Sequence, residues 1–361
     1  MSVLDAVHDA AGARWSGQGP ERVPRNYGDP AAEYAAARTA VVMADRGDRR
    51  FVRVHGRDPV RMIQGLISND IANAPADRAV YAAVLTPKGR MIADVRVVRH
   101  GGELLLETAA AAAEPLMAHL RRFVPPLFAR FEDASGAWSE IGVYGPRARE
   151  AIERAIGAAP DDRFGEDDML EAEYGGGRLL VIGSHDADVP GFDLFVASDS
   201  VERMWSALAA AGARPVGHAT LDVLRIEAGT PKWGAELDET TIPLEAGLRT
   251  RAISESKGCY TGQEVIVRIL HRGHVNWLLR GVLLGEAAAP ERNTPLLEPT
   301  DYRKVGRITS AAWSPKMRQA IALAYVRREV EPGASVHLES ATGRLVQVVA
   351  LPFHADAAPD F

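Results

Sequence analysis

The chain has 361 residues, of which 47% are hydrophobic and 25% charged, a balance typical of a globular protein with a sizeable core. The net charge of −6 gives no general attraction to nucleic acid or to an anionic membrane. The single cysteine, Cys259, excludes an intrachain disulfide and an iron–sulfur cluster held by four thiolates of one copy. We see no secretory h-region and no apolar run of about 18 residues, so we expect a cytoplasmic protein without a nucleic-acid or membrane partner.

The first half of the chain alternates between expected strands and helices. Residues 1–20 are rich in alanine and glycine and are expected to form a flexible lead-in. A strand is predicted to begin at Phe51, and Asp58 and Pro59 then supply an N-cap and a first-turn proline for a helix. Further strands are expected at 81–85, 91–98, 103–107, 141–144, 179–182 and 194–196, and further helices at 115–123, at 146–156 and from 201 to the stop at Gly212.

Beyond Val275 the pattern changes to short apolar runs separated by Gly/Pro turns, with no amphipathic helix. Strands are expected at 278–284, 305–310, 321–326, 336–339 and 345–351. This pattern is typical of a small antiparallel barrel, so the sequence predicts an α+β body followed by a C-terminal all-β module.

Most catalytic fingerprints are absent: the chain has no GxxxxGK[ST], GxGxxG, HExxH or GxSxG. The distinctive string is Lys-Gly-Cys-Tyr-Thr-Gly-Gln-Glu, from Lys257 to Glu264. Thr261 and Glu264 have the spacing of a capping box that opens a helix. Cys259 would then precede a helix N-terminus beside Lys257, and both features favour a reactive thiolate. The alternative is that Cys259 is a small buried side chain and the box is only a cap.

This string, with Arg268 behind it, resembles the signature of the YgfZ-type folate-binding proteins. These are relatives of the glycine-cleavage T-protein, and their mitochondrial members act in iron–sulfur cluster biogenesis. Similar stretches extend over roughly residues 21–354. They lie at 66–70, 81–94, 224–231, 243–245, 247–248, 305–310, 314–315 and 351–353.

The resemblance implies a T-protein-like three-domain ring with two mixed α/β domains and a C-terminal antiparallel β-barrel, and tetrahydrofolate in the central hole. The first α+β domain would comprise residues 21–52 plus 136–215. The second, with the cysteine string, would comprise 53–135 plus 216–274, and the barrel 275–354.

Two carboxylates are candidate folate contacts. The resemblance places the pterin-binding carboxylate at Glu227, whose alternative is a helix-face glutamate paired with Arg225 or solvent. T-proteins have Gly-Gly-x-x-Asp-Asp at the turn that here runs from Gly89 to Asp94, and Ala93 replaces one of the two acids. If the missing acid is the catalytic one, transferase chemistry is lost while folate binding survives. Otherwise Asp94 is a strand-end residue pairing with Arg96 or Lys88.

Other candidates surround these positions. Tyr81 is expected to stack near the pterin, or else simply to pack in its strand. Arg249, Arg251 and Arg268 are candidates to bind the anionic glutamyl tail of folate, and a solvated face is the alternative for each. His271 and His274 do not form a standard zinc pattern with one thiolate, so no metal site within one chain is expected. A cluster shared with another chain through Cys259 stays open.

Three functions remain. The favoured hypothesis is a tetrahydrofolate-binding accessory protein for assembly or repair of iron–sulfur enzymes, with client or assembly proteins as partners and with Cys259 and Lys257 as the reactive groups. The second is a folate-dependent aminomethyltransferase or demethylase of one-carbon metabolism. The third is a purely regulatory folate-binding module.

Overall fold

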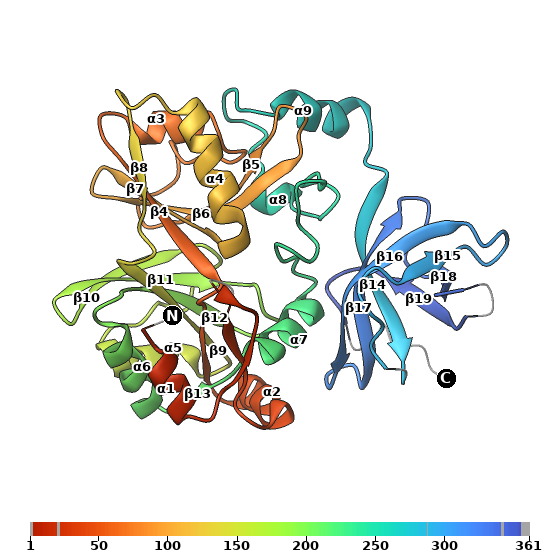
Figure 1. The fold of residues 1–361 in the computed structure, drawn as a ribbon, viewed down its shortest axis with the longest axis horizontal. Helices are drawn as coiled ribbons and strands as arrows, with labels where there is room; N and C mark the ends of the chain where they lie inside the picture. Colours follow the sequence, from red (N-terminus) through yellow and green to blue (C-terminus); the bar gives the residue numbers. More distant parts are fainter. Residues whose placement is uncertain (1–2, 20–21, 287, 341–342, 355–361) are drawn as a thin grey trace. The chain divides into compact units, whose positions relative to one another are not determined.

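The computed structural model describes residues 3–19, 22–286, 288–340 and 343–354 (Figure 1). The chain forms two compact units, each made of separate segments. Unit 1 comprises Met1–Thr86, Ile92–Leu221 and Arg251–Thr261. Unit 2 comprises Pro87–Met91, Asp222–Thr250 and Gly262–Phe361.

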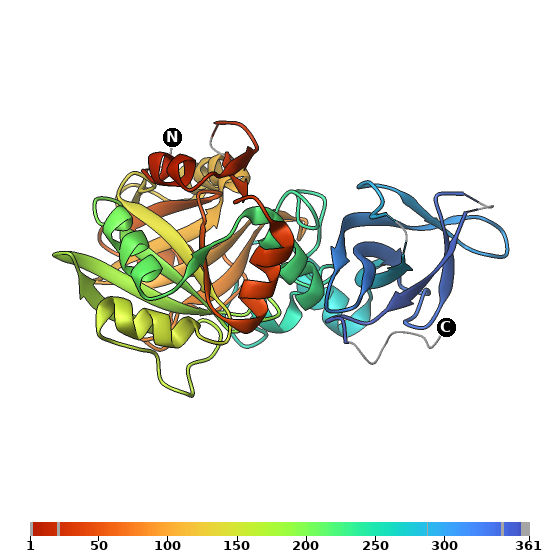
Figure 2. The same cartoon turned by 90° about the horizontal axis from the view of Figure 1, so that it is seen from below.

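Unit 1 contains a six-stranded sheet covered by helices on one face. Its strand order is β10 (Met169–Tyr174), β11 (Gly177–Ser184), β12 (Gly191–Ala197), β9 (Trp138–Tyr144), β3 (Val42–Asp45) and β13 (Arg214–Pro215). The helices α5 (Ala148–Ile156) and α6 (Val201–Ala210) contact each other; Figure 2 draws them in yellow-green and green beside the strands of unit 1. Ile152 and Trp205 from these helices join Leu194 of the sheet in one apolar cluster, which holds the layers together.

Unit 1 also contains a five-stranded sheet, in the order β5 (Val80–Leu85), β6 (Met91–His100), β7 (Glu103–Ala109), β4 (Arg49–His55) and β8 (Arg130–Asp133). Its helices are α3 (Pro59–Gln64), capped by Asp58 as expected, and α4 (Ala110–Phe123). Helix α4 begins five residues before the predicted start, so Pro115 lies inside it. The rings of Phe51 and Phe195 meet edge to face at 4.9 Å and join the two sheets.

The expectation of a flexible lead-in is wrong for the described residues of 1–20. Helix α1 (Asp5–Ala10) and strand β1 (Arg14–Ser16) form here, and β1 pairs with β2 (Val23–Asn26) before helix α2 (Pro30–Thr39). Leu4 and His8 are buried, and His8 Nε2 lies 2.9 Å from Asp45 Oδ2. The segment is ordered by these contacts with residues far along the chain, which its alanine-rich composition does not reveal.

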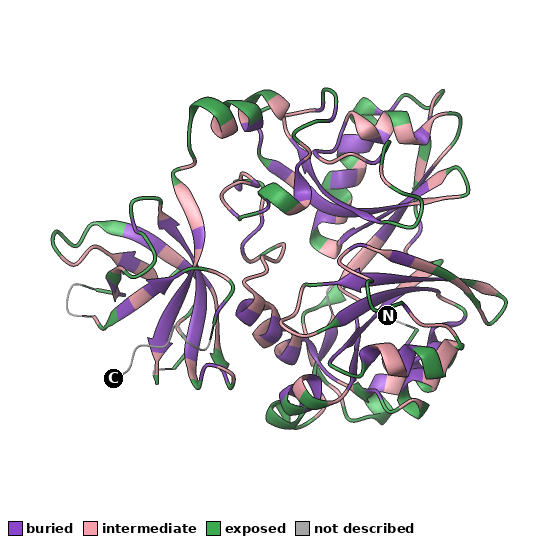
Figure 3. Cartoon of the chain, turned by 180° about the vertical axis from the view of Figure 1, so that it is seen from behind, coloured by how far each residue is buried: buried purple, intermediate pink, exposed green. Residues whose placement is uncertain are grey.

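Unit 2 ends in a closed antiparallel barrel. The strands follow the order β14 (Trp277–Gly285), β17 (Gln319–Arg327), β16 (Lys304–Ser314), β15 (Pro295–Leu297), β18 (Ser335–Leu338) and β19 (Leu345–Val349). The remaining helices are α7 (His218–Ala228), α8 (Arg249–Ala252) and α9 (Gln263–Arg272). Figure 3 shows buried residues along the barrel strands, whereas α9 is mostly exposed.

The predicted α+β body and C-terminal antiparallel barrel are confirmed. The predicted strands do not include β1, β2, β3, β8, β10, β13 or β15. The split of the body into two domains at the expected boundaries stays a prediction. Among the described residues, no helix has the length and apolar character needed to cross a membrane.

Candidate functional site

The centre of the candidate site in unit 1 is a buried pair, Tyr81 on β5 and Asp94 on β6. The Tyr81 hydroxyl donates to Asp94 Oδ2 at 3.1 Å. Asp94 Oδ1 is also buried and has no hydrogen-bond partner among the described residues. An acceptor in that state costs free energy, which a ligand N–H or O–H would recover.

Burial, together with charged neighbours, sets the pKa of Asp94. Burial raises the pKa of its carboxyl, and Glu107 adds to the increase, whereas Arg49 and the Tyr81 hydroxyl oppose it. The Arg49 guanidinium is itself paired with Glu107. Asp94 therefore takes a proton more readily than an exposed aspartate does.

The guanidinium of Arg251 lies over the ring of Tyr81, with its central carbon 4.4 Å from the centre of the ring. It also forms ion pairs with Glu166 at 2.5 Å and Asp186 at 2.8 Å. Burial works to raise the pKa of Asp186, but Arg251 and Arg96 hold it well below its usual range. The structure therefore brings Arg251 to the Tyr81–Asp94 pair. The positive charge of Arg251 is already neutralised by its ion pairs with Glu166 and Asp186.

Lys257 is held by the chain itself. Its ammonium donates to the carbonyl oxygens of Gln64 at 2.6 Å, Ile67 at 2.7 Å and Asn69 at 2.8 Å. Burial lowers its pKa to about 8, against the opposing charge of Asp70. These contacts hold the segment before Cys259 against residues 64–69. The role of Lys257 as a charge acting on the thiol stays a prediction.

Cys259 is exposed, which corrects the alternative that it is a buried side chain. The predicted capping box is wrong. Helix α9 begins at Gln263, and its N-cap is Gly262 at φ 84°, with no side-chain cap hydrogen bond. Thr261 instead donates its backbone N–H to the carbonyl of Gly65 at 3.1 Å. Because the chain takes a left-handed turn at Gly262, a threonine one residue earlier cannot cap the helix.

Glu227 lies in unit 2, near the C-terminal end of α7, and is completely buried. Its carboxylate accepts a hydrogen bond from the Ser314 hydroxyl, and its carbonyl accepts from the Phe353 N–H at 3.1 Å. The alternative of a solvated glutamate on a helix face is therefore wrong. The neighbouring Arg225 pairs with Glu236 at 3.0 Å rather than with Glu227.

The other two arginines are also in unit 2. Arg249 is exposed at the start of α8, and Arg268 is exposed on α9 near His271. The structure thus groups Tyr81, Asp94 and Arg251 in unit 1 and leaves Arg249 and Arg268 on the surface of unit 2. In the described part of the chain, no group of three His, Cys, Asp or Glu side chains is placed to hold a metal ion.

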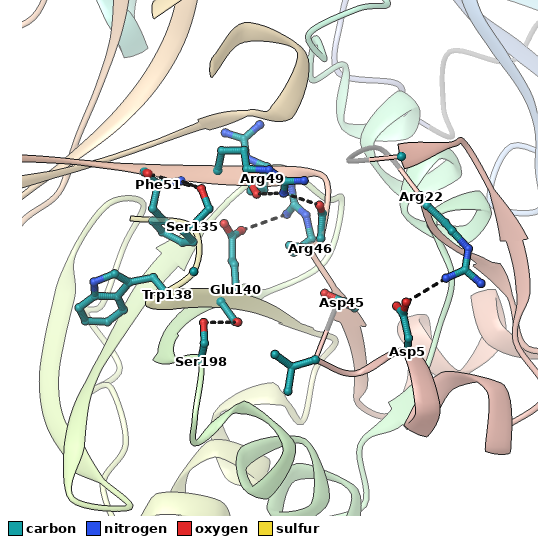
Figure 4. Close-up of a pocket in the computed structure, with 16 residues that line it drawn as sticks. Asp5, Arg22, Asp45, Arg46, Arg49, Phe51, Ser135, Trp138, Glu140 and Ser198 are labelled. Atoms are coloured by element: carbon teal, nitrogen blue, oxygen red, sulfur yellow. Dashed lines mark hydrogen bonds and ion pairs between the residues drawn. The ribbon is translucent and has the colours of Figure 1, made fainter. Parts of the chain in front are cut away.

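A separate cavity of about 580 Å³ opens in unit 1 beside Arg46, Arg49, Trp138 and Glu140 (Figure 4). The Arg46 guanidinium lies 3.7 Å from Glu140 and donates to the hydroxyl of Tyr144 at 2.9 Å. Burial, with Glu107 nearby, raises the pKa of Glu140. The charges lining this cavity largely compensate one another.

Sequence reasoning missed the polar residues that bind the cysteine segment. The Ser68 hydroxyl donates to the Ala252 carbonyl at 2.6 Å, and the Asn69 amide donates to the carbonyls of Tyr81 and Arg251. The signal was present, because the Leu-Ile-Ser-Asn-Asp stretch belongs to the family resemblance. Ala252, the partner of Ser68, lies more than 180 residues further along the chain, so the spacing of residues in the sequence does not reveal this contact.

A mixed α/β body with a closed six-stranded antiparallel barrel at its C-terminal end defines the T-protein class of folds. The model of the GCVT N-terminal domain matches residues 4–256, and that of the glycine cleavage T-protein C-terminal barrel domain matches residues 279–354. The chain belongs to the glycine cleavage T-protein family.

Similar proteins extend over almost the whole chain. The aminomethyltransferase of Rubrobacter xylanophilus is 31% identical, over 96% of this chain and 92% of its own. That of Thermus thermophilus is 30% identical over 97% of both chains. The crystal structure of the glycine cleavage system aminomethyltransferase T from Bartonella henselae has a TM-score of 0.87 at 20% identity, over 98% of this chain and 97% of that one. This last likeness concerns the fold.

Proposed function

We propose that the protein binds tetrahydrofolate and acts as a folate-dependent aminomethyltransferase or demethylase. The single observation that carries the proposal is the buried Tyr81–Asp94 pair, whose Oδ1 atom has no hydrogen-bond partner among the described residues. Relatives of nearly full length are named aminomethyltransferases, which favours this function over the accessory role expected from the cysteine string.

The residues present fit a reduced pterin. Asp94 Oδ1 is a buried acceptor of the kind that a ring N–H satisfies, and Tyr81 presents an aromatic ring beside it. Glu227 lies in unit 2, and its assignment to the pterin is a separate prediction from the family resemblance, since a carboxylate can accept two adjacent N–H groups at once. Bound tetrahydrofolate would supply the nitrogen atoms that carry the one-carbon unit.

The chain's own contribution is to hold a proton and to keep the carboxylate in place. Because burial raises the pKa of Asp94, its carboxyl exchanges a proton closer to neutral pH than an exposed aspartate does. The Tyr81 hydroxyl fixes Oδ2, so Oδ1 is the atom left to meet the ligand. Arg251, stacked on Tyr81, fixes the ring.

The test is release of ammonia and methylene-tetrahydrofolate from aminomethyl-loaded H-protein. We expect turnover by the wild type and a loss of at least about a hundredfold in Asp94→Asn, the range for one general acid–base group. Asp133→Asn, an exposed aspartate on β8, is the matched control. No turnover by the wild type with intact folate binding would exclude the glycine-cleavage reaction.

A second candidate is the YgfZ-type function, a folate-binding accessory protein for iron–sulfur enzymes. It is favoured by an exposed Cys259 on a segment tied down by Lys257, and by Ala93 where T-proteins have an acid. Activity of four-iron enzymes in cells lacking the protein, with rescue by wild type, distinguishes the two candidates. Rescue without aminomethyl turnover would support the second.

A further inference from the structure

Unit 2 contains a basic cavity formed by one side of the barrel and the segment around residues 240–245. Its volume is about 660 Å³, within the usual range of small-molecule sites. Four cationic side chains line it, namely Arg90, Lys304, Arg307 and Arg327. They gather in a protein whose net charge is −6, so the positive charge is a local property of this cavity.

Two of the guanidinium groups lie over aromatic rings. The Arg327 guanidinium carbon lies 5.1 Å from the centre of the Trp277 ring, and that of Arg307 lies 5.8 Å from the centre of the Tyr325 ring. Neither arginine makes an ion pair with a carboxylate among the described residues, and Arg327 Nε is buried without a hydrogen-bond partner there. Stacking restrains a guanidinium and leaves its N–H edge available to a ligand.

The nearby carboxylates do not neutralise this charge. Burial raises the pKa of Glu245, which lines the cavity, and Arg90 and Arg307 oppose the increase. Asp238 accepts hydrogen bonds from Thr240 N at 2.8 Å and from Thr241 Oγ1 at 3.0 Å. Four cations therefore face one lining carboxylate in the described part of the cavity, and the excess is positive.

We propose that this cavity binds a small phosphorylated anion of the diphosphate class. Guanidinium groups bind phosphate oxygens through two parallel N–H···O bonds, and two such groups suit two adjacent phosphates. Lys304 adds a point charge, and Arg90 adds a third guanidinium, which also donates to the Thr240 carbonyl. This inference is independent of the proposed folate function, because it concerns other residues.

Calorimetric titration with inorganic pyrophosphate at about 50 mM salt tests the site. We expect saturable binding with a dissociation constant below about 1 mM, weakened about tenfold or more in Arg307→Gln and in Arg327→Gln. Arg328→Gln is the matched control, because that arginine neighbours Arg327 but pairs with Glu329 at 3.2 Å. Arg307→Lys keeps the positive charge but removes the pair of parallel N–H donors, so this variant should also bind pyrophosphate more weakly.

Thermal unfolding of each variant separates a lost site from a lost fold. ADP should compete with pyrophosphate, whereas tri-γ-glutamate, a chain of carboxylates, should bind more weakly than pyrophosphate. No binding of pyrophosphate, equal binding by Arg327→Gln in a folded protein, or tighter binding of tri-γ-glutamate would overturn the proposal. Tetrahydrofolate is titrated separately, so failure of either proposal is seen independently of the other.

Discussion

The ammonium group of Lys257 donates to the carbonyl oxygen of Asn69 at 2.8 Å, and the side-chain amide of Asn69 donates to the carbonyl of Arg251 at 3.1 Å. These hydrogen bonds connect the segment around Asn69 with the segment from Arg251 to Lys257, almost 190 residues away in sequence, within unit 1. In the first segment, the Asn69 amide also donates to the carbonyl of Tyr81. The second segment continues to Cys259. This network holds the backbone at Lys257, two residues before the exposed Cys259.

Replacing Lys257 with methionine should therefore destabilise the fold. The carbonyls of Gln64, Ile67 and Asn69 would lose a charged donor, and we expect the free energy of unfolding to fall by about 2–4 kcal/mol. Urea unfolding measures the change. Lys88→Met, at an exposed turn position, should stay within about 0.5 kcal/mol of wild type. An equally small effect at Lys257 would show that the carbonyl contacts contribute little.

Glu227 is predicted to serve both stability and ligand binding. Glu227→Ala removes the acceptor of the Ser314 hydroxyl and should lower the free energy of unfolding by about 1–3 kcal/mol. Glu227→Gln keeps an acceptor oxygen but removes the charge. We expect it to retain most of the stability while weakening tetrahydrofolate binding about tenfold. Unchanged folate affinity in the glutamine variant would assign Glu227 a structural role only.

Cys259 should react with iodoacetamide in the native protein, to one equivalent per chain, because its side chain is exposed. Cys259→Ala should keep the fold and folate affinity. On the iron–sulfur hypothesis it should fail to restore four-iron enzymes in cells lacking the protein, whereas the exposed neighbour Ser256→Ala should restore them. Full rescue by Cys259→Ala would leave the thiol without a role in that function.

The fold was predictable wherever the pattern was local. The Asp58–Pro59 start and the 86–89 turn rest on residues next to one another, and both lie where expected. The N-terminal segment was mispredicted because Leu4 and His8 are ordered by distant residues. Strand β15 has three residues, too few for a period to show.

The sequence was sufficient to predict which residues belong to the site, but not which side chains they contact. Tyr81, Asp94 and Arg251 were singled out, and the structure brings them together. The partners of Arg251, however, are Glu166 and Asp186, which no spacing connects to it. The capping box failed because Gly262 takes a positive φ, a conformational choice that the Thr-x-x-Glu pattern does not encode.

Asp94→Asn should stabilise the protein at neutral pH. The folded-state pKa of Asp94 is raised above its ordinary value of 3.8, so its stabilising contribution is complete below that value and is lost as pH rises through the folded-state pKa. Asparagine cannot ionise and still accepts from Tyr81. We expect the melting temperature of the variant to exceed that of wild type at pH 7.5, with the gain shrinking as pH falls toward 3.8. A melting temperature of Asp94→Asn below that of wild type at pH 7.5 would contradict the inference that burying the ionised Asp94 carboxylate destabilises the fold.

The central claim is that the protein binds tetrahydrofolate through Asp94, and calorimetric titration of tetrahydrofolate into wild type and Asp94→Asn tests it most directly. We expect saturable binding by the wild type and an affinity about ten- to a hundredfold lower in the variant, because a buried charged acceptor has been replaced by a neutral one. The exposed control Asp133→Asn should bind like wild type. Absence of detectable wild-type binding at millimolar tetrahydrofolate would contradict the account.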